Sequence, residues 1–455
     1  MDTANLTEPI DFFELFFTED LYALIVHQTN LYAQQFKTFL GLTLLMGIVK
    51  KNELRSYWST DPIHHMPVFS AAMTRARYEV IMRFMHFNDN SLSRPRGDPE
   101  HDRLHKIRPL INHLSQRFTD VYTPHQNICV DESLIHFTGR LAFKQFIPSK
   151  RARYGVKLYK LCERATGYTY KFRIYEGKDT TVEPVGCPDY IGSSGKVVWD
   201  LVSPLFHQGY HLYVDNFYSS VPLFRHLYNL KIGCCGTVRP NRRGFPQRLV
   251  NTRLRKGEKA CLRNEELLAV KWKDKRDVFI MSSIHPDTTV QIATPSGLVD
   301  KPLCVHEYNL NMGGVDLNDQ RMKPYLVSRR AIHWYKKVSI YLFQLAEYNA
   351  FVLYKACNGT ESFLKFKEAI VRSYLYPGGC TPQTTNPDAV SRLHGRHFPE
   401  YLSGTPGQRP PQKRCRVCSR HGIRRDVHTF CPDCLNQPGL CVKDCFRMYH
   451  TLVEY

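Results

Sequence analysis

Apolar residues in the first third of the chain recur at spacings of three and four, which is the period of a helix with one buried face. Thr18 is a suitable N-cap residue for a helix that begins at Glu19. A Pro- and Gly-containing segment at residues 91–102 predicts a loop. Helices are therefore expected around this loop, in residues 12–25, 36–49, 75–87 and 104–114.

The pattern changes after Pro124 to short apolar runs that alternate partly with polar residues, as in β-strands. A strand at residues 212–214 lies between helical patterns that end near 206 and begin at 222, which is the alternation of an α/β domain. A long amphipathic helix is expected at residues 335–357. Further strands are predicted at residues 128–130, 134–137, 156–163, 168–175, 268–272 and 278–281.

Four aspartates stand at the ends or starts of these elements. Asp131 follows one apolar run and Asp215 follows another. Asp316 and Asp319, after the Gly313-Gly314 pair, are three residues apart and so share one face of a helix. Acids that converge from strand ends and a helix suit a metal site. The alternative is that they merely cap these elements.

The chain is strongly basic, with 62 Lys and Arg against 42 Asp and Glu and a formal net charge of +20. The cations cluster in residues 140–160, 239–259 and 404–425, which favours a polyanionic partner such as double-stranded DNA over a mere gain in solubility. The second run also fits a flexible surface loop. Lys336 and Lys337, in the first turn of the long helix, oppose the helix dipole unless an anion lies nearby, and phosphate is the anion expected.

No targeting or membrane segment is evident. Residues 1–34 contain six acids and no Lys or Arg, the reverse of a secretory signal. The longest apolar run, residues 39–49, is too short to cross a bilayer. We therefore expect a soluble protein in a reducing compartment, with no membrane partner.

Six of the 15 cysteines fall in the last 41 residues, in close pairs that are typical of zinc ligands. Too few large apolar residues lie between these pairs to form a core, so metal would supply the folding free energy. Two four-coordinate zinc sites need eight ligands, and these residues supply only seven. His421 and His428 are candidates for the eighth, or a single zinc is bound. The seven are Cys415, Cys418, Cys431, Cys434, Cys441, Cys445 and His450.

Together these blocks resemble the piggyBac family of DNA transposases and the host genes derived from it. The resemblance covers nearly the whole chain. It is carried by Val-Asp-Glu-Ser at 130–133, Ile-Pro-Ser-Lys at 147–150, Tyr-Gly-Val-Lys at 154–157, Val-Asp-Asn-Phe-Tyr at 214–218 and Gly-Gly-Val-Asp-Leu-Asn-Asp-Gln at 313–320.

The resemblance implies a mixed α/β fold: an RNase H-like catalytic domain with an insertion, a mostly helical dimerisation and DNA-binding domain, and a C-terminal zinc-binding cysteine-rich module. Asp131, Asp215 and Asp316 match the catalytic aspartates that hold Mg²⁺ or Mn²⁺, and Asp319 matches a fourth important acid. The implied activity is cut-and-paste transposition into TTAA sites through hairpin ends. A nuclear homodimer on DNA is expected.

Domain boundaries follow from the same comparison. The helical domain would comprise residues 1–126 and 326–400, and the catalytic domain residues 127–240 and 302–325. An insertion would occupy 241–301, a linker 401–412 and the zinc module 413–455. Family members usually have a longer segment before the helical domain, so truncation or a solo gene is expected here.

Two other functions fit parts of the sequence. A domesticated DNA-binding protein would keep the fold without cutting, although all four acids are present. The paired cysteines alone would also suit a protein-interaction or ubiquitin-ligase domain, against which the basic segment before them argues.

Overall fold

The computed structural model describes residues 6–29, 33–148, 150, 153–178, 182–294, 297–327, 333–377, 393, 397–404, 410–434, 436–452 and 455. The chain forms two compact units, residues 1–375 and 376–455. This boundary lies upstream of the predicted linker at 401–412, and part of that linker lies outside the described residues.

The N-terminal part is helical, as predicted. Thr18 Oγ1 accepts a hydrogen bond from Leu21 N just before the helix that begins at Glu19, so the expected cap is present. The helices are α1 (Pro9–Glu14), α2 (Glu19–Thr29), α3 (Ala33–Ile48), α4 (Pro67–Ala72), α5 (Arg75–Phe84) and α6 (Arg108–Asp120).

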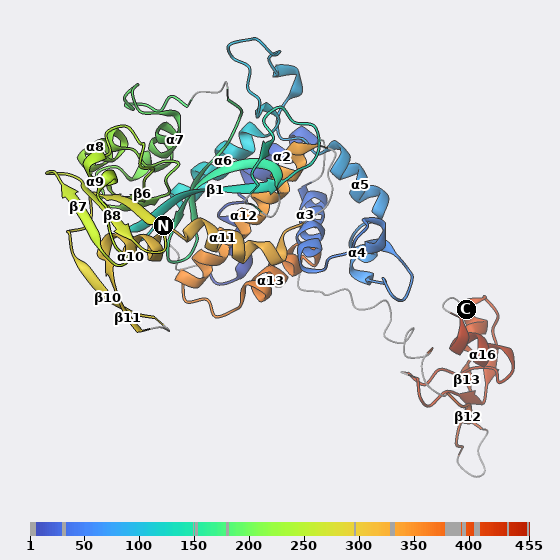
Figure 1. The fold of residues 1–455 in the computed structure, drawn as a ribbon. Helices are drawn as coiled ribbons and strands as arrows, with labels where there is room; N and C mark the ends of the chain where they lie inside the picture. The colour runs from blue at the N-terminus through green and yellow to red at the C-terminus, as the bar shows by residue number, and fades with distance from the viewer. Residues whose placement is uncertain are drawn as a thin grey trace. The chain divides into compact units, whose positions relative to one another are not determined.

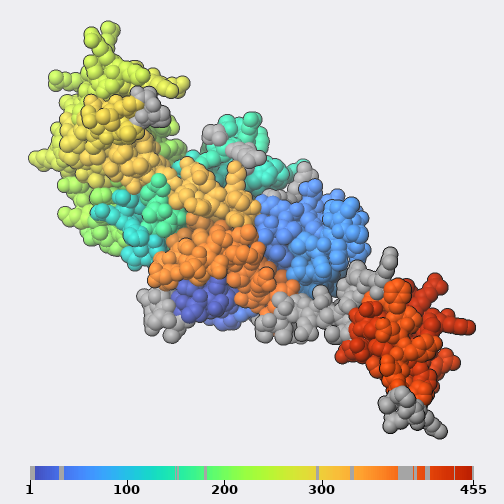
Figure 2. All heavy atoms as spheres, turned by 90° about the horizontal axis from the view of Figure 1, so that it is seen from below, coloured from blue at the N-terminus to red at the C-terminus, as the bar shows by residue number. Residues whose placement is uncertain are grey.

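Two helices from later in the chain complete this layer. α12 (Trp334–Ala356) packs against α1, and α13 (Phe363–Leu375) packs against α3, so segments more than 300 residues apart lie side by side (Figures 1 and 2). Eighteen residues of α12 are buried. This agrees with its sequence, in which apolar residues occur on all sides of the helix.

The phosphate expected beside Lys336 and Lys337 is not needed to balance these cations. The buried Lys336 ammonium donates to the carbonyls of Met82 and Arg83 in the last turn of α5, where a helix dipole favours a cation. Lys337 donates to the carbonyl of Val327.

A large mixed sheet carries the candidate acids. Its first part runs β4–β3–β1–β5–β6, in which the first three strands are antiparallel and the last three are parallel. These strands are β1 (Asn127–His136), β3 (Tyr154–Glu163), β4 (Thr169–Ile174), β5 (His211–Val214) and β6 (Gly233–Thr237), with the short β2 (Gln145–Phe146) beyond β3.

Helices cover both faces of this sheet. Lys171 and Arg173 of β4 bond Asp200 of α7 (Ser193–Val202) on one face. On the other face, Cys129 and Tyr213 share a buried cluster with Val305 and Val315. These two valines belong to α10 (Leu303–Asn311) and α11 (Gly314–Met322), and α8 (Val221–Asn229) connects β5 to β6. The sequence thus forms the expected α/β alternation.

The segment at 241–301 extends the same sheet. β7 (Lys259–Arg263), β8 (Leu268–Lys273) and β9 (Asp277–Ser282) continue it in the order β6–β9–β8–β7, and α9 (Gln247–Asn251) packs on them. A separate hairpin follows, formed by β10 (Thr289–Thr294) and β11 (Gly297–Pro302). The insertion is therefore joined to the α/β sheet by backbone hydrogen bonds.

The second unit is small and rich in cysteine. Its elements are β12 (Glu400–Tyr401), β13 (Lys413–Arg414), α15 (Arg416–Arg420), β14 (Asp426–Val427), β15 (Thr429–Phe430) and α16 (Asp444–Thr451). β12 pairs with β15, and β13 pairs with β14. Its buried cluster consists of five cysteines with Val417, Leu440, Phe446 and Tyr449.

Candidate functional site

Asp131 and Asp215 lie on adjacent parallel strands. The last register pair of β1 and β5 is Val130 with Val214, so the two aspartates are the next residues of each chain. Alternation places them on the same sheet face as Cys129 and Tyr213, which α10 and α11 cover. β5 ends directly before Asp215, whereas the predicted strands at 128–130 and 134–137 form a single strand, β1, that continues past Asp131 to His136 because β3 pairs with it throughout. Asp131 thus marks the end of the parallel ladder.

Burial and neighbouring acids disfavour the ionised forms of both the Asp131 and the Asp215 carboxyl groups. Burial raises the pKa of Asp131 to about 7, and the charges of Glu132 and Asp215 add to the rise while Lys150 opposes it. The pKa of Asp215 is also raised, first by burial and then by Glu132. Carboxylates in this state fit a hard cation, which would neutralise them with oxygen ligands.

Basic side chains surround the pair. Lys150 Nζ donates to the carbonyl of Glu132 at 3.0 Å, and the pKa of Lys157 is lowered by burial despite the acids nearby. Arg239 Nε donates to Asn216 Oδ1 at 3.1 Å in the turn after β5. The start of the second basic run therefore packs beside Asp215. The charge of Arg239 partly offsets the rise in the pKa of that acid.

The α11 helix brings the other two acids to this face. Gly314 permits a close approach, since a Cβ there would lie 2.7 Å from Cys129 Sγ and 2.8 Å from the Glu163 carbonyl. Asp316, in the first turn, is exposed. In the described residues, which include Asp131, Asp215 and Asp316, no three carboxylates have oxygens that all lie within 4.8 Å of one another. The strand register places Asp131 beside Asp215, and the three carboxylates do not form one compact group.

Asp319 has a different environment, because it faces a buried lysine. Lys160 of β3 is fully buried, and its Nζ lies 2.9 Å from Asp319 Oδ1. The same ammonium donates to Asn318 Oδ1 at 2.8 Å and to the Tyr341 hydroxyl of α12 at 2.6 Å. Burial alone would lower the pKa of Lys160, but the charge of Asp319 and the Tyr341 hydroxyl outweigh it, and the pKa is raised.

A second hydroxyl completes this contact. Ser133 Oγ lies 2.8 Å from both oxygens of Asp319, and Ser133 is on the same face of β1 as Asp131. The network therefore ties β1, β3, α11 and α12 together. A cavity of about 540 Å³ adjoins it, lined by Asp316 and Asp319 and by the cations Lys150, Lys323 and Lys337.

The second unit holds two groups of ligand atoms. The first contains Cys415, Cys418, Cys441 and Cys445, and the second contains His397, Cys431, Cys434 and His450. Within each group all the ligand atoms lie within 4.8 Å of one another. The groups alternate along the chain, since the pair 431 and 434 stands between the two pairs of the first group.

The distances within these groups suit tetrahedral zinc. Cys418 Sγ lies 3.8 Å from Cys441 Sγ and 3.5 Å from Cys445 Sγ. With Zn–S bonds of about 2.3 Å, tetrahedral geometry separates two sulfurs by about 3.8 Å. In the second group, Cys431 Sγ lies 3.4 Å from His397 Nδ1, and Cys434 Sγ lies 3.4 Å from His450 Nε2.

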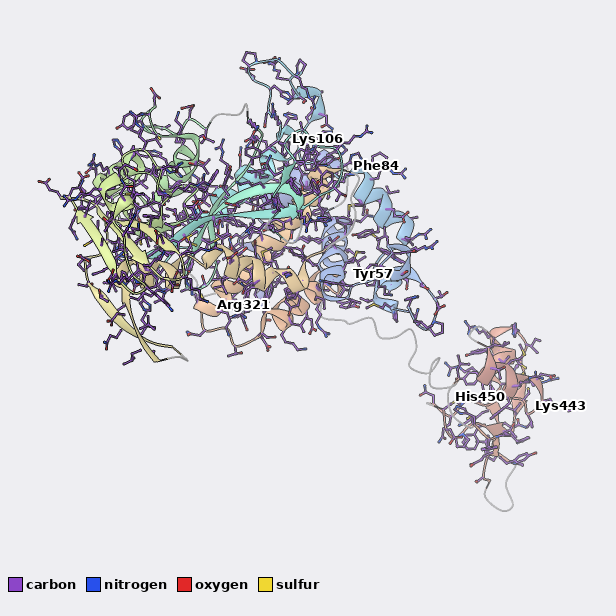
Figure 3. All side chains as sticks on the ribbon, in the orientation of Figure 1. Tyr57, Phe84, Lys106, Arg321, Lys443 and His450 are labelled. Atoms are coloured by element: carbon purple, nitrogen blue, oxygen red, sulfur yellow. The ribbon has the colours of Figure 1, made fainter. Side chains whose placement is uncertain are left out.

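Hydrogen bonds prepare individual ligands. His450, which is labelled in Figure 3, donates from Nδ1 to the carbonyl of Phe446 at 2.7 Å, and this leaves the Nε2 lone pair for the contact with Cys434. Burial raises the pKa of the Cys415 thiol, but N–H groups of Cys418 and Cys441 outweigh it, and the pKa falls below its ordinary value.

The eighth ligand differs from the sequence-based candidates. His421 and His428 belong to neither group, and His428 instead contacts Gln412 and the Pro411 carbonyl. His397 takes the position, although it lies 18 residues before Cys415 and so outside the cysteine spacing. The pairing of β12 with β15 brings this segment of the chain to Cys431.

Comparison with known proteins identifies the family. A sequence model of the family described as Transposase IS4 matches residues 8–351, and one described as a DDE_Tnp_1-like zinc finger matches residues 405–451. Human PiggyBac transposable element-derived protein 3 is 30% identical over 97% of this chain and 76% of its own. The chain belongs to the piggyBac family.

Other piggyBac relatives agree. Human PiggyBac transposable element-derived protein 2 is 28% identical over 97% of this chain and 76% of its own. The fold matches the cryo-EM structure of a piggyBac transposase synaptic complex with hairpin DNA, with a TM-score of 0.75, 23% identity and coverage of 95% and 98% of the two chains. The mixed α/β fold and the cysteine-rich module are thus confirmed, and the zinc-finger match with the cysteine groups suggests Zn²⁺. No helix in the described ranges is long and apolar enough to cross a membrane.

Several residues of the site were missed from sequence. Lys160 stands in a basic run that suggested a surface for phosphate, yet it is fully buried. Tyr218, whose hydroxyl donates to Glu132 Oε2 at 3.0 Å, and Glu132 both lie in the motifs at 214–218 and 130–133, but neither was singled out as a site residue. His397 could have been found by searching for histidine well before the first cysteine pair.

Lys160→Met should lower the free energy of unfolding of the first unit by about 1–3 kcal/mol, because it leaves the buried Asn318 and the partly exposed Asp319 without the cation that they share. Urea unfolding monitored by tryptophan fluorescence measures this, since all four tryptophans lie in that unit. Lys171→Met is the matched control on β4. Its side chain is 20% exposed, so losing its pair with Asp200 should cost about 1 kcal/mol or less. Equal effects of the two changes would contradict the assigned role of Lys160.

Proposed function

We propose that this protein is a metal-dependent DNA transposase of the cut-and-paste type, which binds transposon ends, cleaves DNA and joins it to target sites, with TTAA the expected target. The observation that carries the proposal is the pair Asp131 and Asp215 at the end of the β1–β5 parallel ladder, with raised pKa values, beneath the helix that bears Asp316 and Asp319. The strand order β4–β3–β1–β5–β6 supports an RNase H-like catalytic domain.

Asp131, Asp215 and Asp316 would hold Mg²⁺ or Mn²⁺, which activates an attacking oxygen and stabilises a leaving oxygen in phosphoryl transfer. Asp131 and Asp215 fit this role because burial leaves their charge in need of a cation. Asp319 is better described as a positioning residue. Its carboxylate is held by Lys160 and Ser133, and it thereby orients α11 and Asp316, one helical turn away.

Cations beside the acids would bind the DNA backbone. Lys150 and Arg239 lie next to the acid pair, and Lys323 and Lys337 line the adjoining cavity. Their charges attract phosphate and partly offset the repulsion between DNA and the carboxylates. Double-stranded DNA is therefore the proposed partner, and the proposed location is the nucleus. A homodimer is proposed from the family resemblance.

We propose two zinc ions in the C-terminal module, each bound by one of the two alternating ligand groups. The basic residues around them suit contact with the DNA of transposon ends. The cysteine pairs alone would also fit a protein-interaction domain, but four cations flank Cys415 and Cys418 in the sequence: Lys413, Arg414, Arg416 and Arg420.

A second candidate is a domesticated DNA-binding protein that no longer cuts. It is favoured by the human relatives, whose names describe them as transposable element-derived proteins. The four acids favour the enzyme. Cleavage by the purified protein distinguishes the two functions.

Replacing Asp131, Asp215 or Asp316 by Asn should reduce Mg²⁺-dependent cleavage of a duplex with candidate transposon ends by more than about hundredfold. Each change removes a metal-ligand charge, and losing even an outer partner of a metal costs about 10–100-fold. Asp120→Asn, an exposed acid at the end of α6, is the control. Cutting by Asp215→Asn at the full rate would contradict the assignment, and no cutting by the unmodified protein would support domestication.

DNA binding should depend steeply on salt. For six to ten phosphate contacts, affinity is expected to fall by about 10³-fold or more between about 50 and 200 mM salt, because bound counterions are released. Fluorescence anisotropy of a labelled duplex without Mg²⁺ measures this separately from cleavage. A response to salt that is nearly flat would argue against binding through the basic surfaces.

Removing zinc should unfold the C-terminal module and leave the first unit folded, since the module's core consists largely of cysteine. Hydrogen exchange should rise across residues 397–452 on chelation, while tryptophan fluorescence stays unchanged. His397→Ala should lower the zinc content from two ions to about one, and His428→Ala should retain both. Two zinc ions in the His397→Ala protein would refute its role as a ligand.

A further inference from the structure

A well-defined cavity outside the acid site lies beyond the end of β1. Its volume is about 710 Å³, within the range of ligand pockets. The walls come from the loop before α6, from the loop that follows β1, and from the first residue of α12. Its main side chains are Arg96, Arg103, Lys106, Arg140, Phe143 and Trp334.

The cavity is positively charged. In the described part of the chain, no carboxylate pairs with Arg96, Lys106 or Arg140, all of which are exposed. Lys106 lies over the ring of Tyr335, 5.1 Å from its centroid, and is labelled in Figure 3. Burial lowers the pKa of the neighbouring Lys336 to about 8, and the charges of Lys106 and Arg83 add to this shift.

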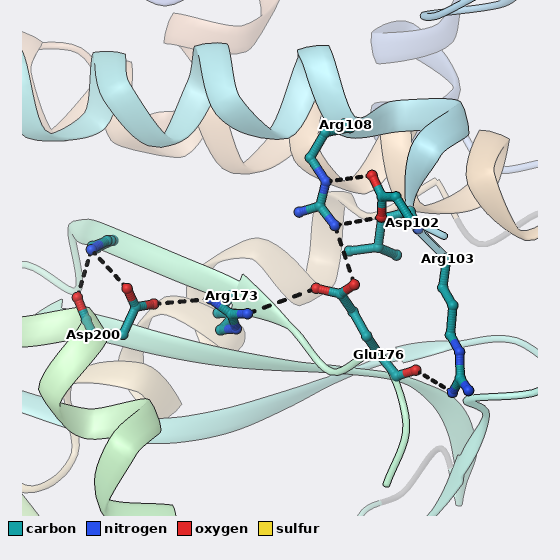
Figure 4. A network of polar contacts seen from close by, with 8 residues as sticks. Asp102, Arg103, Arg108, Arg173, Glu176 and Asp200 are labelled. Carbon is teal, nitrogen blue, oxygen red and sulfur yellow. Dashed lines mark hydrogen bonds and ion pairs between the residues drawn. The ribbon is translucent and has the colours of Figure 1, made fainter. Parts of the chain in front are cut away.

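A polar network holds one wall and neutralises its acid (Figure 4). Asp102 is the acid in the lining, and Arg108 holds it through two hydrogen bonds of 2.8 and 2.6 Å. Arg108 also contacts Glu176, whose carbonyl accepts a hydrogen bond from Arg103 at 2.8 Å. The acid charge is therefore already balanced, and Arg103 is fixed at the cavity wall.

An aromatic surface faces the same space. Trp334 is half-buried and lines the cavity, and its ring packs edge-on against the buried Phe143, with centroids 5.2 Å apart and an interplanar angle of 81°. An anchored indole beside several cations suits a base that stacks while its phosphates are held by Arg and Lys. A small anion would use the charge but not the ring, and paired bases of a duplex would offer the ring no free face.

We propose that this cavity binds an unpaired nucleotide of the DNA substrate, with its base on Trp334 and its phosphates near Arg96, Lys106 and Arg140. The inference rests on the proposed function, because it assumes that DNA is bound. β1 connects the two sites, and Asp131 to His136 spans about 17 Å along the strand. With a rise of about 3.4 Å per base pair, that distance corresponds to roughly five base pairs of DNA.

The test compares two labelled DNAs by anisotropy without Mg²⁺: a blunt duplex, and the same duplex with a single-stranded tail of thymidines. The unmodified protein should bind the tailed DNA about ten- to hundredfold more tightly, the range expected for stacking one base. Trp334→Ala should abolish this preference and retain blunt-duplex binding, whereas Trp334→Phe should keep most of it. In the unmodified protein, tailed DNA should also quench tryptophan fluorescence, and in the Trp334→Phe protein much less.

Arg140→Gln should weaken binding of the tailed DNA and reduce its salt slope by about one. Arg55→Gln is the matched control, because Arg55 is exposed and already paired with Glu53. The inference is overturned if the Trp334→Ala protein retains the full preference for the tail, or if the unmodified protein binds both DNAs equally. Equal binding would still leave the proposed transposase function intact, whereas failure to bind either DNA would count against both.

Discussion

The fold around the acid site depends on one buried charge. Moving the Lys160 ammonium out of water costs several kcal/mol, and this cost is met only while Asp319, Asn318 and Tyr341 remain in contact with it. Because these partners come from α11 and α12, the lysine holds both helices on the sheet. Any displacement of α11 leaves a cation buried without a counter-charge, so the position of Asp316 is set by an interaction in which Asp316 takes no part.

The electrostatics of the site follow from the place where the sheet changes from antiparallel to parallel pairing. β1 is antiparallel to β3 and parallel to β5, and the parallel ladder ends at Val130 and Val214. The two following acids then stand side by side on a face that helices cover, and burial raises the pKa of both. Such a pair stores electrostatic repulsion that a divalent cation relieves, and the surrounding Lys and Arg side chains add the charge that phosphate requires.

Much of this arrangement was predictable from local patterns, and what was missed depends on distant contacts. The helices at 19–29 and 334–356 and the strands β3, β5, β8 and β9 have strong periodicity, so their positions were predicted within a few residues. β6 has the sequence Gly-Cys-Cys-Gly-Thr, which carries almost no strand propensity and forms because β5 and β9 flank it. Lys160 looks like a surface cation by composition. Its burial is set by residues more than 150 positions later, which no local pattern reports.

The C-terminal module shows the same limit in another form. Its candidate ligands alternate between two groups along the chain, so neither group comes from one contiguous segment. When the residues of one group come together, they also bring residues of the other group closer. The cysteine spacing indicated six candidate ligands, and His450 was added to them. The remaining member of the second group is His397, which the pairing between β12 and β15 brings to Cys431 and Cys434. A core of cysteines and four larger apolar residues cannot fix that geometry through burial alone. The two candidate ligand groups and the short strands are therefore expected to form together, and His397 belongs to the folded module although it lies far outside the cysteine spacing.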